Sequence, residues 1–307
     1  MKSRNLTFFT VANPGMPRWL DGDKWSILKK IPDSYLPQTV FIPLWTDIEQ
    51  VLVRQEEKSL HYPLIVKPNN GARGRWVKKI THEQALRTYH QCIWEDYLLQ
   101  EFIDFPIELG VFYIRKPWAD QGEIVGVSYK EFQYIIWDGQ KTFVELLEEG
   151  ERTARFLDNY RWEHQQIRNK VIPAWEKIQV SVRGNHAQGA QCFDKSEYIS
   201  PVNSRIFDDI SEQIWGIYYG RYDIKCSSFE DFQQGKNIKI IEFNGIIAEP
   251  LHIYDYRYGP FQGYRKWLRY TKSLWEISNV NISRGYKSLT MKEFLAWIQT
   301  QAKNLKV

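Results

Sequence analysis

"YPLIVKPNNGARGRW", Tyr62 to Trp76, is the stretch that most constrains the fold of this sequence. An apolar run typical of a β-strand ends in Lys67, and the chain then breaks into Pro-Asn-Asn-Gly and a loop with two glycines and two arginines. Glycines let backbone N–H groups approach phosphate oxygens, and Lys67, Arg73 and Arg75 supply positive charge. The stretch is therefore either a solvated hairpin or the phosphate-binding loop of a nucleotide site.

Motifs and composition narrow the class of protein. No GxxxxGK[ST] and no GxGxxG occurs, so a nucleotide fold here must be of another kind. The 307 residues suffice for about two or three subdomains. The net charge of +4 is spread among acids, which does not support nucleic-acid binding. Three cysteines without a CxxC spacing indicate neither a disulfide framework nor a zinc site and fit a cytoplasmic location.

Hydrophobic patterning predicts alternating strands and helices. No run of about 18 apolar residues occurs, and the first residues lack a long apolar segment, which argues against export and against a membrane-spanning segment. No membrane partner is expected. We expect the 15% of aromatic residues to pack cores and subdomain seams. Expected strands include TVFIP, PLIVK, YLLQEFI and IELGVFYI, and expected helices include DIEQVLVRQEEKS, HEQALRTYHQCI and SRIFDDISEQIWGIYY. The pattern predicts an α+β or mixed α/β fold with antiparallel strand pairs.

Polar residues recur at a spacing of two in two late segments, GRYDIK and IIEFNG. Arg221 and Asp223 share one face of a strand, and Glu242 and Asn244 share a face of the next. If these strands pair, Asp223, Glu242 and Asn244 converge as oxygen ligands of the kind magnesium prefers. The alternative is a pair of solvated edge strands with alternating polar residues.

The ordered blocks IVKPNNGARG, QEFIDFPIELGVF, GRYDIK and IIEFNG resemble the ATP-grasp superfamily, and within it the D-alanine:D-alanine-ligase-like ligases. The resemblance runs from about Lys24 to Asp255. No single block is specific; their order and internal spacing are. It implies an ATP-grasp fold, in which ATP is held between the sheets of two α+β subdomains.

The resemblance also implies a set of ATP-binding residues. Lys24 and Lys67 would contact phosphates beneath a mobile flap, the segment from Glu101 would line the adenine, and Glu108 would bind the ribose. The set is Lys24, Lys67, Asn69, Gly71, Arg73, Gly74, Arg75, Glu101, Phe102, Ile103 and Glu108.

The implied activity is that of an ATP- and magnesium-dependent carboxylate-amine ligase. Asp223, Glu242 and Asn244 match magnesium ligands, which could also hold manganese, and Arg221 matches an arginine that steadies developing oxyanions. The enzyme would activate a carboxylate as an acylphosphate and join it to an amine. A phosphotransferase that uses the same ATP site, or a non-catalytic nucleotide-binding module, is the alternative.

Candidate substrate-binding residues lie outside these blocks. In SVRGNHAQGAQCFD, Arg183 could clamp a carboxylate and His186 could assist removal of a proton from an amine. Lys225 falls on the same strand face as Asp223 and is a further catalytic candidate. The segment after Asn244 offers Glu249, His252 and Asp255, which could equally be packing residues.

The expected organisation has three parts. Residues 1–60 would form a short N-terminal segment, 61–135 a small lid subdomain, and 136–307 a large subdomain with the metal site and closing helices. Only 23 residues precede Lys24, where D-alanine ligases carry a whole domain, so D-alanine specificity is not expected. The expected partners are a small-molecule carboxylate and amine, amino-acid or peptide-like, and no nucleic acid.

Overall fold

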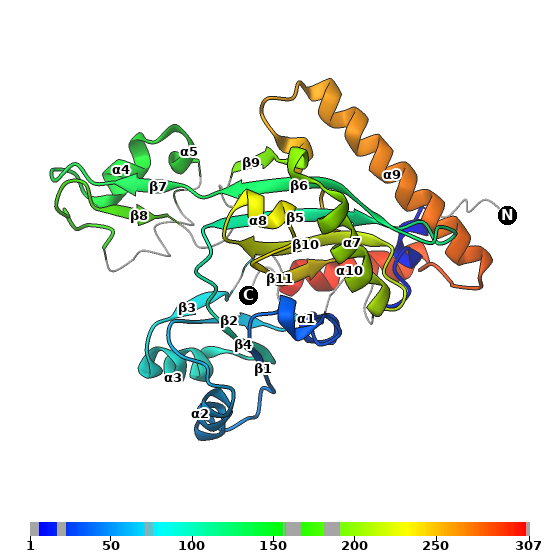
Figure 1. Cartoon of the computed structure of the whole chain (residues 1–307). Helices are drawn as coiled ribbons and strands as arrows, with labels where there is room; N and C mark the ends of the chain where they lie inside the picture. The colour runs from blue at the N-terminus through cyan, green and yellow to red at the C-terminus, as the bar shows by residue number, and fades with distance from the viewer. Residues whose placement is uncertain are drawn as a thin grey trace.

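The computed structural model describes residues 6–16, 23–70, 74, 76–155, 157, 167–180 and 191–304. The structure has two antiparallel sheets, of four and five strands, and a third pair of strands, together with helices. The expected mixed α+β fold is therefore confirmed. The two larger sheets lie one above the other in Figure 1. Within the described residues, no helix is both long and apolar enough to cross a membrane.

The small sheet has the strand order β1-β4-β2-β3, from Thr39–Ile42, Tyr97–Glu101, Leu64–Pro68 and Lys78–Ile80. Helices α2 (Ile48–Glu57) and α3 (Glu83–Cys92) belong to it. Their apolar stripes supply Val51 and Leu86 to a core that also holds Val66 and Leu99 of the sheet. This packing holds the end of β2, where Lys67 lies, in a rigid frame.

The large sheet has the order β11-β10-β5-β6-β9, from Ile238–Asn244, Tyr219–Cys226, Ile107–Ile114, Glu123–Glu131 and Gln191–Asp194. Helices α7 (Pro201–Gln213) and α8 (Phe229–Gln233) pack through Phe207 and Phe232 into the core on one face of it. The same core takes Ile27 from α1 (Lys24–Leu28) and Leu98 from β4. One hydrophobic core therefore joins the two sheets.

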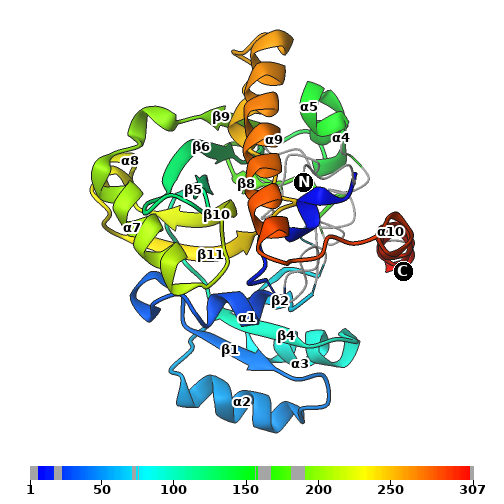
Figure 2. The ribbon, with the colours of Figure 1, turned by 90° about the vertical axis from the view of Figure 1, so that its right-hand side faces the viewer.

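The opposite face of the large sheet is covered at one end. There η5 (Leu251–Tyr254), α9 (Pro260–Ser283), η1 (Phe8–Val11) and α10 (Met291–Asn304) contribute side chains to a separate apolar cluster. Figure 2 shows α9 crossing this side of the molecule. The other end of the face is left to the candidate site.

Between β6 and β9 the chain forms a small module of β7 (Tyr134–Ile136), β8 (Lys177–Gln179), α4 (Phe143–Glu149) and α5 (Glu151–Ala154). It has its own core, in which Trp137 stacks on Phe143 with ring centroids 5.4 Å apart. The module projects from the large sheet at the left of Figure 1. The short 3-10 turns η2 (Asp33–Tyr35) and η4 (Ser196–Tyr198) complete the described elements.

The division of the chain differs from the expected one. Strand β1 and helix α2 belong to the small sheet, although residues 1–60 were expected to form a separate segment. Strands β5 and β6 belong to the large sheet, although residues 61–135 were expected to form the small subdomain. The expected boundaries at 60 and 135 are wrong for these strands because β1 pairs with β4 and β5 pairs with β10, and such distant pairings are not encoded in local periodicity.

Gly15 offers a test of how the N-terminal segment docks. A Cβ added to Gly15 would lie 1.5 Å from the backbone oxygen of Trp215, whereas one added to Gly259 would meet nothing within 4 Å. We expect Gly15→Ser to lower the free energy of unfolding by roughly 1 to 3 kcal/mol, as overpacking does. The matched control Gly259→Ser should be neutral, because serine suits its position at the start of α9. Equal urea midpoints for the two variants would contradict this packing.

Candidate functional site

Lys67 reaches from the small sheet to the large one. Its Nζ donates hydrogen bonds to Gln100 Oε1 of β4 at 3.0 Å and to the backbone oxygen of Ile241 of β11 at 2.6 Å. The residue is 6% exposed. The end of β2 therefore presents its lysine at the junction of the two sheets.

A β-bulge in β11 lies where Lys67 makes its contact. On β10, Asp223 pairs with Glu242, but the following residue pairs with Ile240, so Ile241 is extra in the ladder. The extra residue of a bulge is left out of the regular pairing. Lys67 therefore donates to the backbone oxygen of the bulged residue. Bulges are often found next to active sites.

Burial lowers the pKa of Lys67 to about 8, and Glu242 opposes this shift while Lys24 adds to it. The ammonium group is thus held in a place that disfavours its charge, with a second cation nearby. An anion that entered this junction would stabilise both lysines.

Helix α1 is fixed beside Lys67 by Asn69. The side-chain oxygen of Asn69 accepts from Trp25 N at 2.9 Å, and its amide donates to Asp23 Oδ1 at 2.8 Å. These bonds place Lys24 at the start of the helix, with Nζ 3.6 Å from Glu242 Oε1. Asn69 was expected to bind ATP; its described contacts position the helix that carries Lys24.

A network of buried charges lies on the large sheet. Asp223 accepts from Arg221 Nε at 2.7 Å and Nη2 at 3.1 Å, and from Asn244 Nδ2 at 3.0 Å. Lys130 of β6 lies 3.3 Å from Asp223 Oδ1 and donates to Glu108 Oε1 at 2.9 Å. Burial alone would raise the pKa of Asp223, but Arg221 and Lys130 outweigh it and hold this pKa at about 2.

The expected metal ligands are brought together on paired strands. Asp223 lies opposite Glu242, and Arg221 lies opposite Asn244, so all four face the same way. Within the described ranges, no three or more His, Cys, Asp or Glu side chains form a group that could hold a metal ion. Two carboxylates and an amide oxygen remain a donor set that suits magnesium with phosphate and water in its other positions.

Lys130 was not expected from the sequence. It lies in EIVGVSYKE, where every second residue faces the same side of β6. This alternation places Lys130 on a buried face of β6. It does not reveal the partners of Lys130, which come from β5 and β10. Only the strand order of the large sheet, with β5 between β10 and β6, shows that a buried lysine joins Glu108 to Asp223.

The expected adenine segment links the two sheets. Glu101 ends β4; its N–H donates to Gln38 O at 2.8 Å and its Oε2 accepts from Gln38 N at 3.1 Å. The carboxylate is thus turned toward the strand edge beside β1. Ile103 is buried, and backbone groups of the segment remain as candidates for reading a ring edge.

Phe102 lies between cations of both sheets. Lys79 Nζ of β3 is 3.8 Å from the centre of its ring, and Lys225 Nζ of β10 is 5.6 Å from it. Lys225 also donates to Phe105 O at 3.3 Å. Lys225 therefore contacts the segment that is expected to line adenine, and its expected catalytic role stays a prediction.

Some expected site residues fall outside the described residues: Gly71, Arg73, Arg75, Arg183 and His186. Gly74 is described and has a φ of +71°, which glycine adopts without strain. The nearby Trp76 packs against Trp94, with ring centroids 4.8 Å apart.

The segment after β11 divides into a site residue and buried residues. Arg221 Nη1 donates to the backbone oxygen of Glu249 at 2.8 Å, and the Glu249 side chain is exposed. His252 is 1% exposed and its Nε2 lies 2.8 Å from the hydroxyl of Tyr270. The expectation that His252 contacts substrate is wrong for this structure, because its ring fills the core. Asp255 is also buried, where it accepts from Asp194 N at 2.6 Å.

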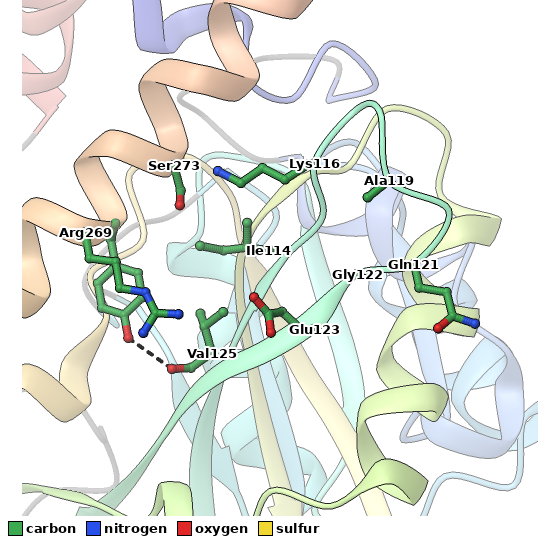
Figure 3. A pocket seen from close by; sticks show the side chains of 10 residues that line it. Ile114, Lys116, Ala119, Gln121, Gly122, Glu123, Val125, Arg269 and Ser273 are labelled. Carbon is green, nitrogen blue, oxygen red and sulfur yellow. Dashed lines mark hydrogen bonds between the residues drawn. The ribbon is translucent and has the colours of Figure 1, made fainter.

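A cavity of about 350 Å³ lies at the covered end of the large sheet (Figure 3). It is formed by the β5–β6 connection and α9, with Glu123, Arg269 and Ser273 among its lining residues. Tyr270 closes one side, where its hydroxyl donates to Val125 O at 3.0 Å. None of the expected site residues that the structure describes lines this cavity.

Comparison with protein-family models gives no match, and neither does comparison with curated proteins. Among solved structures, the chain matches a bifunctional glutathione synthetase from Pasteurella multocida at 13% identity and a TM-score of 0.40, over 75% of this chain and 33% of that one. It matches D-alanine–D-alanine ligase from Bacillus anthracis complexed with ATP at 13% identity and a TM-score of 0.46, over 85% of this chain and 66% of that one. It matches VanG D-Ala:D-Ser ligase from Enterococcus faecalis at 13% identity and a TM-score of 0.46, over 85% of this chain and 60% of that one.

These three matched structures are those of one synthetase and two ligases. This chain spans between 33% and 66% of the length of these three structures. The roles of individual residues therefore have to be argued from the contacts in this chain.

His252 provides a test of its buried role. Burial lowers its pKa to about 4, a shift that Asp194 opposes and Lys266 reinforces. The unfolded chain therefore binds a proton at higher pH than the folded one, and stability should be lost as pH falls through the window from about 6.5 to 4. Between pH 7 and pH 5, we expect wild type to lose about 2 kcal/mol more than His252→Gln in urea unfolding. Identical losses would contradict a buried neutral imidazole.

Lys130 can be tested through the two carboxylates that it joins. Lys130→Met should lower the free energy of unfolding by roughly 3 to 5 kcal/mol, because Glu108 and Asp223 would lose a buried partner. Lys225→Met is the matched control, since Lys225 donates to a backbone carbonyl and its loss leaves no buried charge. Urea unfolding that finds a smaller effect for Lys130→Met than for Lys225→Met would contradict the network.

Proposed function

We propose that this chain is an ATP- and magnesium-dependent ligase of the ATP-grasp kind, which activates a carboxylate as an acylphosphate and joins it to an amine. The observation that carries the proposal is the cluster of cations at the junction of the two sheets. Its members are Lys24, Lys67, Lys130 and Arg221.

The charge at this junction favours a polyanion. Four cations meet three carboxylates, those of Glu108, Asp223 and Glu242, so the cluster keeps one excess positive charge. Buried charges are stable only when they are paired and hydrogen-bonded. A nucleotide triphosphate with magnesium carries net negative charge, and its phosphate oxygens can accept from the lysines. Binding would let Lys67 exchange the Ile241 oxygen for a phosphate oxygen.

The residues fit a phosphoryl-transfer site in their arrangement. Lys24 and Lys67 would orient the phosphates from the small-sheet side, and Arg221 would stabilise the negative charge that develops on the acyl oxygen when the amine attacks the acylphosphate. Asp223, Glu242 and Asn244 would hold magnesium, which neutralises charge on the phosphate oxygens. The segment from Glu101 to Ile103 would line the base between the sheets.

The reaction balances in two steps. A substrate carboxylate oxygen attacks the γ-phosphorus, and the bond to the leaving ADP oxygen breaks, which gives an acylphosphate. An amine nitrogen then attacks the acyl carbon, loses a proton, and phosphate leaves. The protein's part is to position the reactants, to stabilise charge and to exclude water. The substrates are proposed to be small molecules of amino-acid or peptide-like kind.

Trapping with hydroxylamine tests the reaction. Hydroxylamine converts an acylphosphate to a hydroxamate, so incubation with magnesium, ATP, hydroxylamine and a mixture of amino acids should give hydroxamate and phosphate together. A phosphotransferase would give ADP and a stable phosphorylated product without hydroxamate. ATP binding without any turnover would indicate a non-catalytic module, and either result would overturn the ligase proposal.

Lys67→Ala should weaken ATP binding and nearly abolish turnover, because the site loses the cation that both sheets hold in place. The apparent affinity should fall by about tenfold or more, as expected for one charge-assisted hydrogen bond. Lys78→Ala, which removes an exposed lysine from the neighbouring strand, is the control and should bind ATP normally. Calorimetry that gives wild-type ATP affinity for Lys67→Ala would refute this role.

A further inference from the structure

Residues 256–275 form a basic stretch of the chain that is rich in aromatic residues. They contain five arginines and lysines, seven aromatic residues and no acid. The whole chain has a net charge of +4, so the rest of it carries a net charge of −1. The stretch begins just after η5 and includes α9 from Pro260 to Trp275.

Helix α9 turns apolar side chains to both sides. Tyr270 and Ile277 face the core. Phe261, Tyr264 and Leu268 follow a spacing of three and four residues and lie exposed on another face. Phe261 is 77% exposed. A surface helix normally turns polar residues outward, so an exposed apolar face on α9 indicates a site that contacts another molecule or a membrane.

The exposed apolar ridge extends beyond the helix. It consists of Tyr254, Tyr256, Phe261, Tyr264, Trp267 and Leu268. Tyr264 and Trp267 stack with ring centroids 5.9 Å apart. Several of these side chains border a shallow hollow of about 400 Å³ between η5 and α9.

Cations flank the ridge. Arg265 and Arg269 are exposed and enter no ion pair among the described residues, and Lys272 reaches Glu276 only at 3.9 Å. Lys266 is different, because its Nζ lies 2.8 Å from Asp194 and is held toward the body of the protein. The surface around the ridge therefore presents exposed guanidinium groups beside exposed aromatic rings.

We propose that this ridge docks onto the surface of an anionic lipid bilayer. Tyrosine and tryptophan settle at the headgroup level, phenylalanine and leucine enter the acyl boundary, and arginines attract anionic headgroups. The first turns of α9 lie at the upper edge of the molecule in Figures 1 and 2, where a flat surface can reach them. Single-stranded nucleic acid instead favours a positively charged groove, and Leu268 offers it no stacking surface.

The docked ridge would lie next to the candidate site. Tyr254 belongs to the ridge and interacts with the Glu249 side chain, and the Glu249 backbone accepts from Arg221. Docking does not depend on the proposed ligase activity, because the ridge and the cation cluster use different residues.

Vesicle sedimentation tests the proposal on the full chain. Vesicles of equal parts phosphatidylcholine and phosphatidylglycerol should bind the protein, vesicles of phosphatidylcholine alone should bind it weakly, and added salt should reduce binding. Phe261→Ser with Leu268→Ser, and separately Arg265→Gln with Arg269→Gln, should each lower the partition coefficient by about tenfold. Trp45→Ser is the control: Trp45 is 91% exposed on the small-sheet side and should not matter.

Three results would overturn the proposal. The first is a lack of binding to both vesicles, and the second is binding that neither double variant weakens. The third is a ridge that serves another partner: self-association or binding of a single-stranded oligonucleotide that the double variants abolish, without vesicle binding. Each variant should keep the urea midpoint of wild type, which shows that the fold is retained whether or not the protein binds ATP.

Discussion

The hydrogen bond from Lys67 to the backbone of Ile241 is the interaction around which the two sheets are arranged. It requires a lysine at the end of β2, a bulge in β11 and a core that holds the sheets together. Burying an ammonium group is unfavourable, and the lowered pKa of Lys67 reflects this. A lysine kept at such a cost is typical of a site whose ligand supplies the missing negative charge.

The surrounding charges follow from the same constraint. Lys24 is placed by α1, which Asn69 fixes to the end of β2. On the large sheet, Arg221 and Lys130 compensate Asp223, so its carboxylate stays ionised. These groups satisfy one another's charges, which keeps them oriented for the nucleotide and metal that we propose bind there.

Much of the fold and part of the site could be predicted from the sequence. Alternating polar residues predicted that Asp223, Glu242 and Asn244 lie on paired strands, and the register confirms this. Lys130 was missed and β5 was misplaced because both depend on which distant strands are neighbours. For His252 the sequence left substrate contact and packing open, because its burial depends on Gly126 of β6, over which its ring packs, and on Tyr270 of α9.

Hydrogen exchange with and without magnesium and a non-hydrolysable ATP analogue tests the central claim most directly. If nucleotide lies at the Lys67 junction, amides at the end of β2, in Glu101–Ile103 and along β10 and β11 should become protected together, because one ligand contacts both sheets. Unchanged exchange in all of these segments at a saturating concentration of the analogue, or protection confined to another part of the chain, would contradict it.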